Sequence, residues 1–296
     1  MMSVVMEEIN KFTPLGIRFW DPVFDCQIRD ALNVTIHPVL NDQKISRAYR
    51  TIGDIYTFNH IYGLWDIETA PYTNEVETDS PVETKQYIVN IHDDSNRYLD
   101  VSLQISLPLP YKGVFLSNHH SDSPSTTSPK GLYLYSSTVR RAPGWVAMVR
   151  GEMIDADSEQ PVSGALLKIT AESGETHYGI SDKQGRFMVL FAYPVLVEGF
   201  GGSPSSSSHR PLSQLFWELE LEVFYSPEMQ QRLPGSIAPD YISLLTQQAA
   251  EIWEQEPGEG VSPVTALSLQ LALHKTIIAR TEGLSNLLIS TQDTSP

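Results

Sequence analysis

The chain has one cysteine, Cys26, among its 296 residues. A single cysteine forms no intramolecular disulfide, so stability must come from packed cores, and a reducing compartment is the expected site of synthesis. The longest apolar run, residues 187–197, is interrupted by Pro194 and is shorter than the ~20 residues that span a bilayer. Residues 1–8 lack a basic region and an apolar stretch, so we expect no secretory signal there. The sequence predicts no membrane span and synthesis in the cytoplasm, which leaves open release within an assembled particle.

Basic residues are also few. The chain carries 20 Lys and Arg against 36 Asp and Glu, a formal net charge of −16. Binding to nucleic acid requires clustered cations that displace counterions from phosphates, and no Lys/Arg-rich run is present. The acidic balance therefore argues against a nucleic-acid partner and against an anionic membrane surface. It indicates either a solvated surface or a basic protein partner.

Alternation of apolar and polar residues is the dominant pattern. It is clearest in Leu99–Leu107, Leu215–Val223 and Leu267–Leu273. Successive strand residues point to opposite faces, so each segment is predicted to be a half-buried strand of an antiparallel sheet with one face wet. Shorter predicted strands cover Gln86–Ile91, Gly131–Tyr135, Val146–Ile154, Ala165–Ala171, Phe187–Phe191 and Leu287–Ser290.

One segment has helical spacing. Between Asp240 and Glu254 the apolar residues lie on one face of a helix, Asp240 suits the N-cap, and Pro257 follows the end. Residues 118–130 and 200–213 are rich in Ser, Thr, Gly or Pro and are predicted to be long surface loops. The prediction is an all-β protein of two tandem immunoglobulin- or transthyretin-like sandwiches, residues 1–140 and 141–296, with one short helix near the C-terminus.

The two halves share an internal pattern at an offset of about 130 residues. In the second half a strand ends at Asp155, a second strand follows, and Gly185 opens a third strand. In the first half the corresponding positions are Asp21 and Gly53. Glycine suits such turns because it accepts a positive φ, so both glycines are predicted to take one.

The string in the second half resembles the carboxypeptidase regulatory-like domain, a transthyretin-type sandwich. The matching positions are Asp155, Pro161, Val162, Gly164, Ala165, Ser181, Asp182, Gly185 and Phe187. The resemblance covers roughly residues 145–200, and the first half, which lacks the proline, matches weakly. It implies a structural or adhesive module without catalytic machinery.

A looser resemblance spans more of the chain. It rests on the order of Phe19–Asp21, Gly131–Tyr135, Gly179–Asp182 with Gly185-Arg186, Tyr193-Pro194 and the closing strands. This order is similar to that of accessory structural proteins of extracellular contractile injection systems of the antifeeding-prophage type. It implies partners among the baseplate or spike subunits of a phage-tail-like particle, and no cofactor.

Two groups of residues have the chemistry of metal ligands. His119, His120 and Asp122 lie together, but on a predicted loop with no further ligand at a diagnostic spacing. Spike-tip proteins of the PAAR type bind zinc through three His and one Cys, and this chain has Cys26 with His37 and His60 on predicted strands or turns. Neither pattern indicates convergence on one ion, so no metal site is predicted.

Catalytic patterns are equally weak. His92-Asp93-Asp94 is predicted to be a turn that ends a strand, without a second acid. Ser205–Ser208 with His209 lacks the rigid turn and the orienting acid of a nucleophile. Asp155, Asp157 and Glu159 lack the glycine and distal glutamate of a calcium loop and are interpreted as an acidic turn.

The sequence therefore predicts a non-enzymatic structural component of a contractile injection particle, at the spike tip or baseplate periphery. Two alternatives stay open. One is an adhesion or carbohydrate-binding module, which would use exposed aromatic residues among the five tryptophans. The other is a transthyretin-like hydrolase with a site split between the halves, although the chain lacks the C-terminal Tyr-Arg-Gly-Ser of that family.

Overall fold

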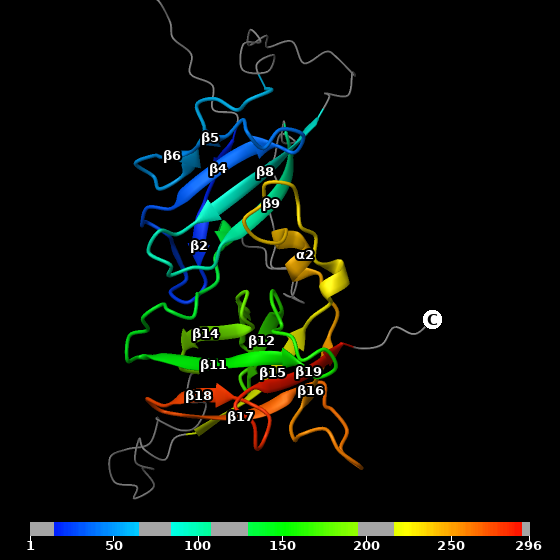
Figure 1. Ribbon diagram of the computed structural model, residues 1–296. Helices are drawn as coiled ribbons and strands as arrows, with labels where there is room; N and C mark the ends of the chain where they lie inside the picture. Colours follow the sequence, from blue (N-terminus) through cyan, green and yellow to red (C-terminus); the bar gives the residue numbers. More distant parts are fainter. Residues whose placement is uncertain (1–14, 65–83, 108–129, 195–215, 292–296) are drawn as a thin grey trace, which may run out of the picture.

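The computed structural model describes residues 15–64, 84–107, 130–194 and 216–291. These residues form an all-β protein of two sandwiches, as predicted, drawn one above the other in Figure 1. The predicted loops 118–130 and 200–213 lie almost entirely outside the described residues.

The first sandwich contains short strands throughout its described part. They are β1 (Gly16–Ile17), β2 (Phe19–Asp21), β3 (Cys26–Gln27), β4 (Asn33–Pro38), β5 (Ser46–Arg47), β6 (Tyr49–Arg50), β7 (Tyr56–Thr57), β8 (Lys85–His92), β9 (Val101–Leu107) and β10 (Leu132–Tyr133). The main sheet is antiparallel in the order β5-β4-β8-β9, and two small sheets have the orders β1-β7-β6 and β10-β2-β3. Phe19, Ile36 and Tyr87 are fully buried in the core between them.

The second sandwich has two larger sheets. Its elements are β11 (Val146–Asp155), β12 (Leu166–Ala171), β13 (Thr176–Ile180), β14 (Arg186–Ala192), β15 (Phe216–Phe224), the 3₁₀ helix η2 (Pro227–Met229), α2 (Tyr241–Leu245), β16 (Ala250–Trp253), β17 (Leu267–Ala272), β18 (Thr276–Ala279) and β19 (Leu287–Thr291). One sheet has the order β13-β12-β15-β17, and the other has the order β14-β11-β19-β16 with β18 on β11.

Alternation decides which side chains fill this second core. Trp217, Leu219 and Leu221 of β15 are buried between the sheets, whereas Glu218 and Glu220 are exposed. The half-buried pattern predicted for this strand is confirmed. Because residues i and i+2 share a face, the outer faces of both sheets follow directly from the sequence.

The predicted helix over residues 240–254 is right at its start and wrong at its end. The Asp240 side chain accepts a hydrogen bond from the Ser243 backbone N–H, as an N-cap does, but α2 ends at Leu245. Residues 250–253 form β16, which pairs antiparallel with β19. Ala250 and Ile252 both point into the core, so their apolar character has period two rather than the helical period.

The internal repeat holds for one of its two glycine turns. Gly185 takes the predicted positive φ of 76°, and β14 begins directly after it. In the first half the positive φ falls on Asp54 (58°) and not on Gly53, so that prediction is wrong. Aspartate tolerates the left-handed region better than most residues, which explains the shift by one position.

Candidate functional site

The two sandwiches meet at a junction to which a connecting segment contributes. Residues 226–249, which connect β15 to β16 and which we call the arm, leave the second sandwich and lie on the first. The arm approaches β9 closely enough for a parallel bridge between Ser102 and Asp240. In Figure 1 α2, which belongs to the arm, lies beside β9.

Two polar side chains of the first sheet hold the arm by its backbone. The Asn90 amide on β8 donates to the Gly235 carbonyl at 3.0 Å. The Ser102 hydroxyl on β9 accepts from the backbone N–H groups of Ile237 and Ala238, both at 3.1 Å, and donates to the Asn90 side-chain oxygen at 2.7 Å. Ser102 is completely buried, so the face of β9 predicted to be wet is covered by the arm at this position.

Asp240 binds both parts of the molecule. One carboxylate oxygen accepts from the Ser243 backbone N–H at 3.2 Å and caps α2. The other accepts from the Gln104 backbone N–H of β9 at 2.9 Å. Asp240 is buried, and hydrogen bonds to a buried carboxylate are roughly twice as strong as neutral ones.

The helix α2 completes a core shared by both halves. Tyr241, Leu244 and Leu245 are buried in the cluster that fills the first sandwich, together with Leu166 and Ile180 of the second. The Tyr241 hydroxyl donates to the Tyr133 carbonyl at 2.9 Å. Burial raises the pKa of Tyr241 well above its ordinary value, which keeps the hydroxyl protonated as a donor.

A buried ion pair holds the segment that leads into the second sandwich against the first sandwich. Asp21, at the end of β2, binds the guanidinium of Arg140 from the segment that leads into β11. The Tyr98 hydroxyl donates to the same carboxylate at 2.8 Å, and Arg140 also donates to the Ser136 hydroxyl at 2.9 Å. The guanidinium lies between the rings of Tyr98 (4.8 Å) and Phe24 (5.1 Å).

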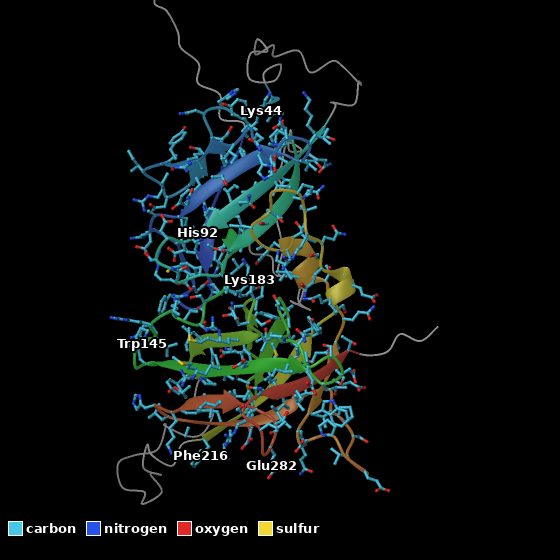
Figure 2. The ribbon with its side chains drawn as sticks, viewed as in Figure 1. Lys44, His92, Trp145, Lys183, Phe216 and Glu282 are labelled. Atoms are coloured by element: carbon cyan, nitrogen blue, oxygen red, sulfur yellow. The ribbon has the colours of Figure 1, made fainter. Side chains whose placement is uncertain are left out.

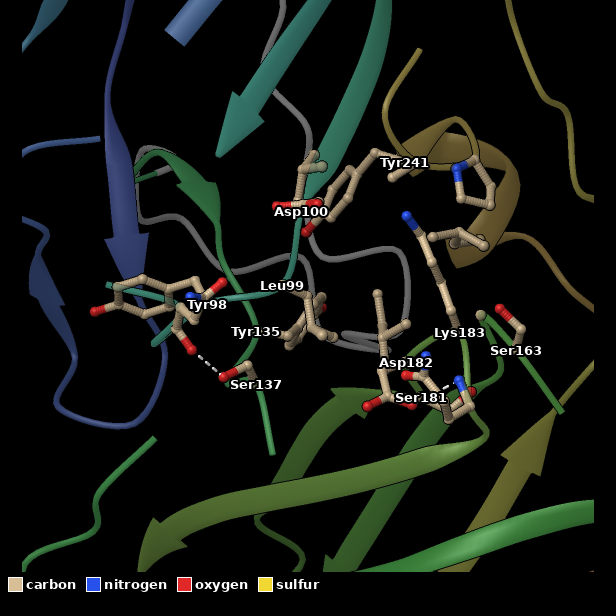
Figure 3. A pocket seen from close by; sticks show the side chains of 18 residues that line it. Tyr98, Leu99, Asp100, Tyr135, Ser137, Ser163, Ser181, Asp182, Lys183 and Tyr241 are labelled. Atoms are coloured by element: carbon tan, nitrogen blue, oxygen red, sulfur yellow. Dashed lines mark hydrogen bonds between the residues drawn. The ribbon is translucent and has the colours of Figure 1, made fainter. Parts of the chain in front are cut away.

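A cleft of about 270 Å³ lies between these two contacts. Its lining comes from both sandwiches and the arm: Asn96, Tyr98, Leu99, Asp100, Val101, Tyr135, Ser137, Ser163, Gly164, Ile180, Ser181, Asp182, Lys183, Gln184, Ala238, Pro239, Tyr241 and Leu244. Figure 3 shows Lys183 rising from the second sandwich toward Tyr241. Tyr135 and Tyr241, which both line it, stack with ring centroids 6.3 Å apart.

Two serine hydroxyls of the cleft are engaged in structural bonds. The Ser181 hydroxyl donates to the Val162 carbonyl at 2.6 Å and accepts from the Ala165 N–H at 2.9 Å. The Ser137 hydroxyl donates to the Asn96 carbonyl. A nucleophile needs a base as its hydrogen-bond partner, and among the described lining residues neither hydroxyl has one.

His92 is close to the cleft without lining it. Its Nδ1 lies 2.7 Å from the carboxylate of Asp100, and this hydrogen bond raises the pKa of the imidazole. Asp93 accepts from the backbone N–H groups of Ser95 and Arg97. The interpretation of His92-Asp93-Asp94 as a turn that ends a strand is therefore confirmed.

The residues weighed as metal ligands do not gather in the part of the chain that the structure describes. No group of three His, Cys, Asp or Glu suited to a metal ion is found there. Cys26 is exposed on β3, whereas His37 is buried on β4. His119, His120 and Asp122, like Ser205–Ser208 and His209, lie outside the described residues.

The acidic turn after β11 also forms as interpreted. The Asp155 side chain accepts from the backbone N–H groups of Asp157 and Ser158 at 3.2 and 2.7 Å. A carboxylate used in this way stabilises the turn locally.

Among the described helices none is long and apolar enough to cross a membrane.

Sequence reasoning missed the residues that join the halves. Asn90 interrupts an apolar strand, and an amide at a buried position needs partners. The polar residue within an apolar strand therefore indicates a buried hydrogen bond, although it does not identify the arm as the partner. The predicted division after residue 140 stays a prediction, because the arm completes the core of the first half.

Comparison with known proteins identifies no family. No family model and no curated protein matches the chain. Among solved structures, the shaft pilin SpaA of Lactobacillus rhamnosus GG is 10% identical, with coverage of 96% of this chain and 100% of the pilin and a TM-score of 0.23. A C-terminal fragment of the pilus adhesin SpaC from the same organism is 9% identical, covers 93% and 96%, and has a TM-score of 0.20. The T6 backbone pilin of Streptococcus pyogenes is 9% identical, covers 97% and 63%, and has a TM-score of 0.22.

Proposed function

We propose that this protein is a non-enzymatic structural subunit, a stiff two-sandwich block within a larger protein assembly. The observation that carries the proposal is that the connection between the halves is fixed at two places: the arm binds the first sandwich, and the Asp21–Arg140 pair holds the start of the linker against it. Two separate contacts restrict rotation about the linker more than either contact alone. A subunit that holds a fixed spacing between its neighbours needs this stiffness.

The chemistry of the cleft supports a structural role over a hydrolytic one. The hydroxyls of Ser137 and Ser181 donate to backbone carbonyls. Of the two acids, Asp100 is bound to His92 and Asp182 to Arg186, both outside the lining. Among the described lining residues Lys183 is the one cation, and it is exposed. Use of the Ser137 or Ser181 hydroxyl as a nucleophile would require it to exchange its structural partner for a base.

We propose that the assembly is a phage-tail-like contractile injection particle, with this chain at the spike tip or baseplate periphery. The support is the sequence resemblance to accessory proteins of such particles together with the stiff two-sandwich architecture. The alternative of a carbohydrate-binding module would need a row of exposed aromatic rings. Among the described residues the exposed adjacent aromatic rings form separate pairs, Phe24 with Trp145 and His60 with Tyr62, and not a row.

Mass spectrometry of density-purified tail-like particles from the producing cells tests the proposal. The expected result is this chain at a stoichiometry that is constant across gradient fractions and lost when the sheath gene is deleted. Particles that inject normally and contain none of this chain would refute the particle assignment. A glycan array, with Trp145→Ala as the matched variant, tests the alternative, and specific binding lost in that variant would replace the proposal.

A further inference from the structure

The outer face of the sheet that contains β14, β11 and β18 combines exposed apolar and cationic side chains. Ala147 and Val149 of β11 point into the core, so Met148 and Arg150 point outward. In the parallel register of β11 and β18, Arg150 lies opposite Ile278, whose surface is 54% exposed. A partner that covers this exposed isoleucine and the arginine beside it would bury apolar surface, which favours binding.

Two aromatic rings extend this face toward the first sandwich. Trp145 precedes β11 and is 60% exposed, and the exposed ring of Phe24 lies against it. Met188 and Leu190 of β14 form a small cluster with Val23 on the same side of the sheet. Figure 2 shows Trp145 at the edge of the second sandwich, near the junction with the first.

The cations of this face have no ion-pair partner among the described residues. Continuing the β18 register by one residue places Arg280 opposite Glu152 on the same face, but no ion pair joins them. Arg150 and Arg280 are both exposed. We call Trp145, Met148, Arg150, Ile278 and Arg280 the arginine face. In a chain with a net charge of −16, two arginines beside apolar residues and without an ion pair in the described structure are unusual.

The other sheet of the same sandwich presents the complementary chemistry. On β15 the outward residues are Phe216, Glu218, Glu220 and Glu222, which we call the acidic strip. Phe216 is 52% exposed, and Glu218 and Glu220 have no cation partner among the described residues, whereas Glu222 binds Lys168 at 2.8 Å. The strip thus pairs one exposed aromatic ring with two carboxylates that have no cation partner among the described residues, of which Glu218 accepts a hydrogen bond from Gln270 at 3.1 Å.

The spacing of the charges matches on the two surfaces. Glu218 and Glu220 are two residues apart on one strand, which separates their Cα atoms by about 7 Å. Arg150 and Arg280 lie on neighbouring strands and two positions apart along them, which gives about 8 Å. Two carboxylates can therefore meet two guanidiniums in one docking arrangement, with Phe216 near the apolar part of the arginine face.

We propose that the arginine face docks onto the acidic strip of a second copy of this chain. The two surfaces lie on opposite sheets of one sandwich, so the contact is heterologous, and in a pair one copy keeps a free acidic strip while the other keeps a free arginine face. Such a contact builds rows or rings of copies. It is a property of the isolated protein and holds whether or not the assembly is a contractile particle.

Analytical ultracentrifugation of the full chain up to about 0.5 mM, at about 50 mM and about 500 mM NaCl, tests this contact. The expected result is association that grows with concentration and weakens about tenfold or more at high salt. Arg150→Glu with Arg280→Glu, and separately Glu218→Arg with Glu220→Arg, should each leave the protein monomeric. An equimolar mixture of these two double variants should associate again, because each reversed surface then faces an opposite charge.

The matched control is Lys44→Glu with Arg47→Glu, which makes the same change of net charge as the arginine double variant, but on the first sandwich. At each salt concentration, this control should associate as strongly as the unaltered chain. Circular dichroism and thermal unfolding should show native structure in every variant, because all substituted residues are exposed. Monomers at every concentration, no complex in the mixture, or equal loss in the control would each overturn the proposal.

Discussion

Replacing Asp240 by alanine is expected to release the arm from the first sandwich. The substitution removes the N-cap of α2, which contributes about 1 kcal/mol. It also removes the carboxylate that accepts from the Gln104 N–H, and a hydrogen bond to a charged group contributes about 1.5–3 kcal/mol. We therefore expect Asp240→Ala to lower the free energy of unfolding by about 3 kcal/mol.

Urea unfolding followed by circular dichroism measures this loss, and hydrogen exchange of the Gln104 amide locates it. Asp240→Asn is the matched control, because its one amide oxygen can still accept from the Gln104 N–H, whereas its NH2 group cannot accept from the Ser243 N–H and the cap is lost. We expect the asparagine variant to lose about 1 kcal/mol and to keep the Gln104 amide protected. A loss below about 1 kcal/mol for Asp240→Ala, with the amide still protected, would refute the role given to this residue.

Three further predictions concern the turn, the ion pair and a buried histidine. Gly185→Ala should cost about 3 kcal/mol in urea unfolding, because φ is 76° and a Cβ would collide with the Met153 carbonyl oxygen. Arg140→Ala should cost about 3–5 kcal/mol in the same assay, because it strands the buried carboxylate of Asp21. Burial lowers the pKa of His177 in the folded protein to about 4. As the pH falls, this histidine therefore takes up a proton in the unfolded chain before it does so in the folded protein. Stability should fall between pH 6.5 and about 4, and His177→Phe should flatten that slope.

Each of these predictions has its own control. Gly174 also has a positive φ (82°) but open space at its Cβ, so Gly174→Ala should cost only about 1 kcal/mol. An equal cost for Gly174→Ala and Gly185→Ala would show that the backbone contact is unimportant. Arg141→Ala, at an exposed neighbour, should change stability by less than about 0.5 kcal/mol, and a similar loss at both arginines would contradict the buried pair. An unchanged slope in His177→Phe would remove that histidine from the pH dependence.

Strands could be predicted wherever one face meets the core and the other meets water. β15 is the clearest case, because its carboxylates remain exposed. β9 shows the limit: its polar Ser102 predicts a wet face, yet the hydroxyl is buried against the backbone of the arm. A residue suited to water is equally suited to a buried hydrogen bond, so the pattern alone does not distinguish the two.

The helix and the junction were beyond what local pattern could provide. Residues 240–254 satisfy a helical face, but Ile252 pairs with Ile289 of β19, a residue far away in the chain. The cap at Asp240 is a local feature and was predicted correctly, whereas its bond to Gln104 spans 136 positions. The junction depends on such distant contacts, and for that reason the candidate site emerged only from the structure.

Residual dipolar couplings of backbone amides in both halves test most directly whether the protein is one stiff block. A single alignment tensor is expected to fit the couplings of both sandwiches in the unaltered chain, whereas the variant that combines Asp240→Ala with Arg140→Ala should require two. Two tensors of different magnitude in the unaltered chain would contradict this expectation, because they would show that the halves move independently despite the arm and the ion pair.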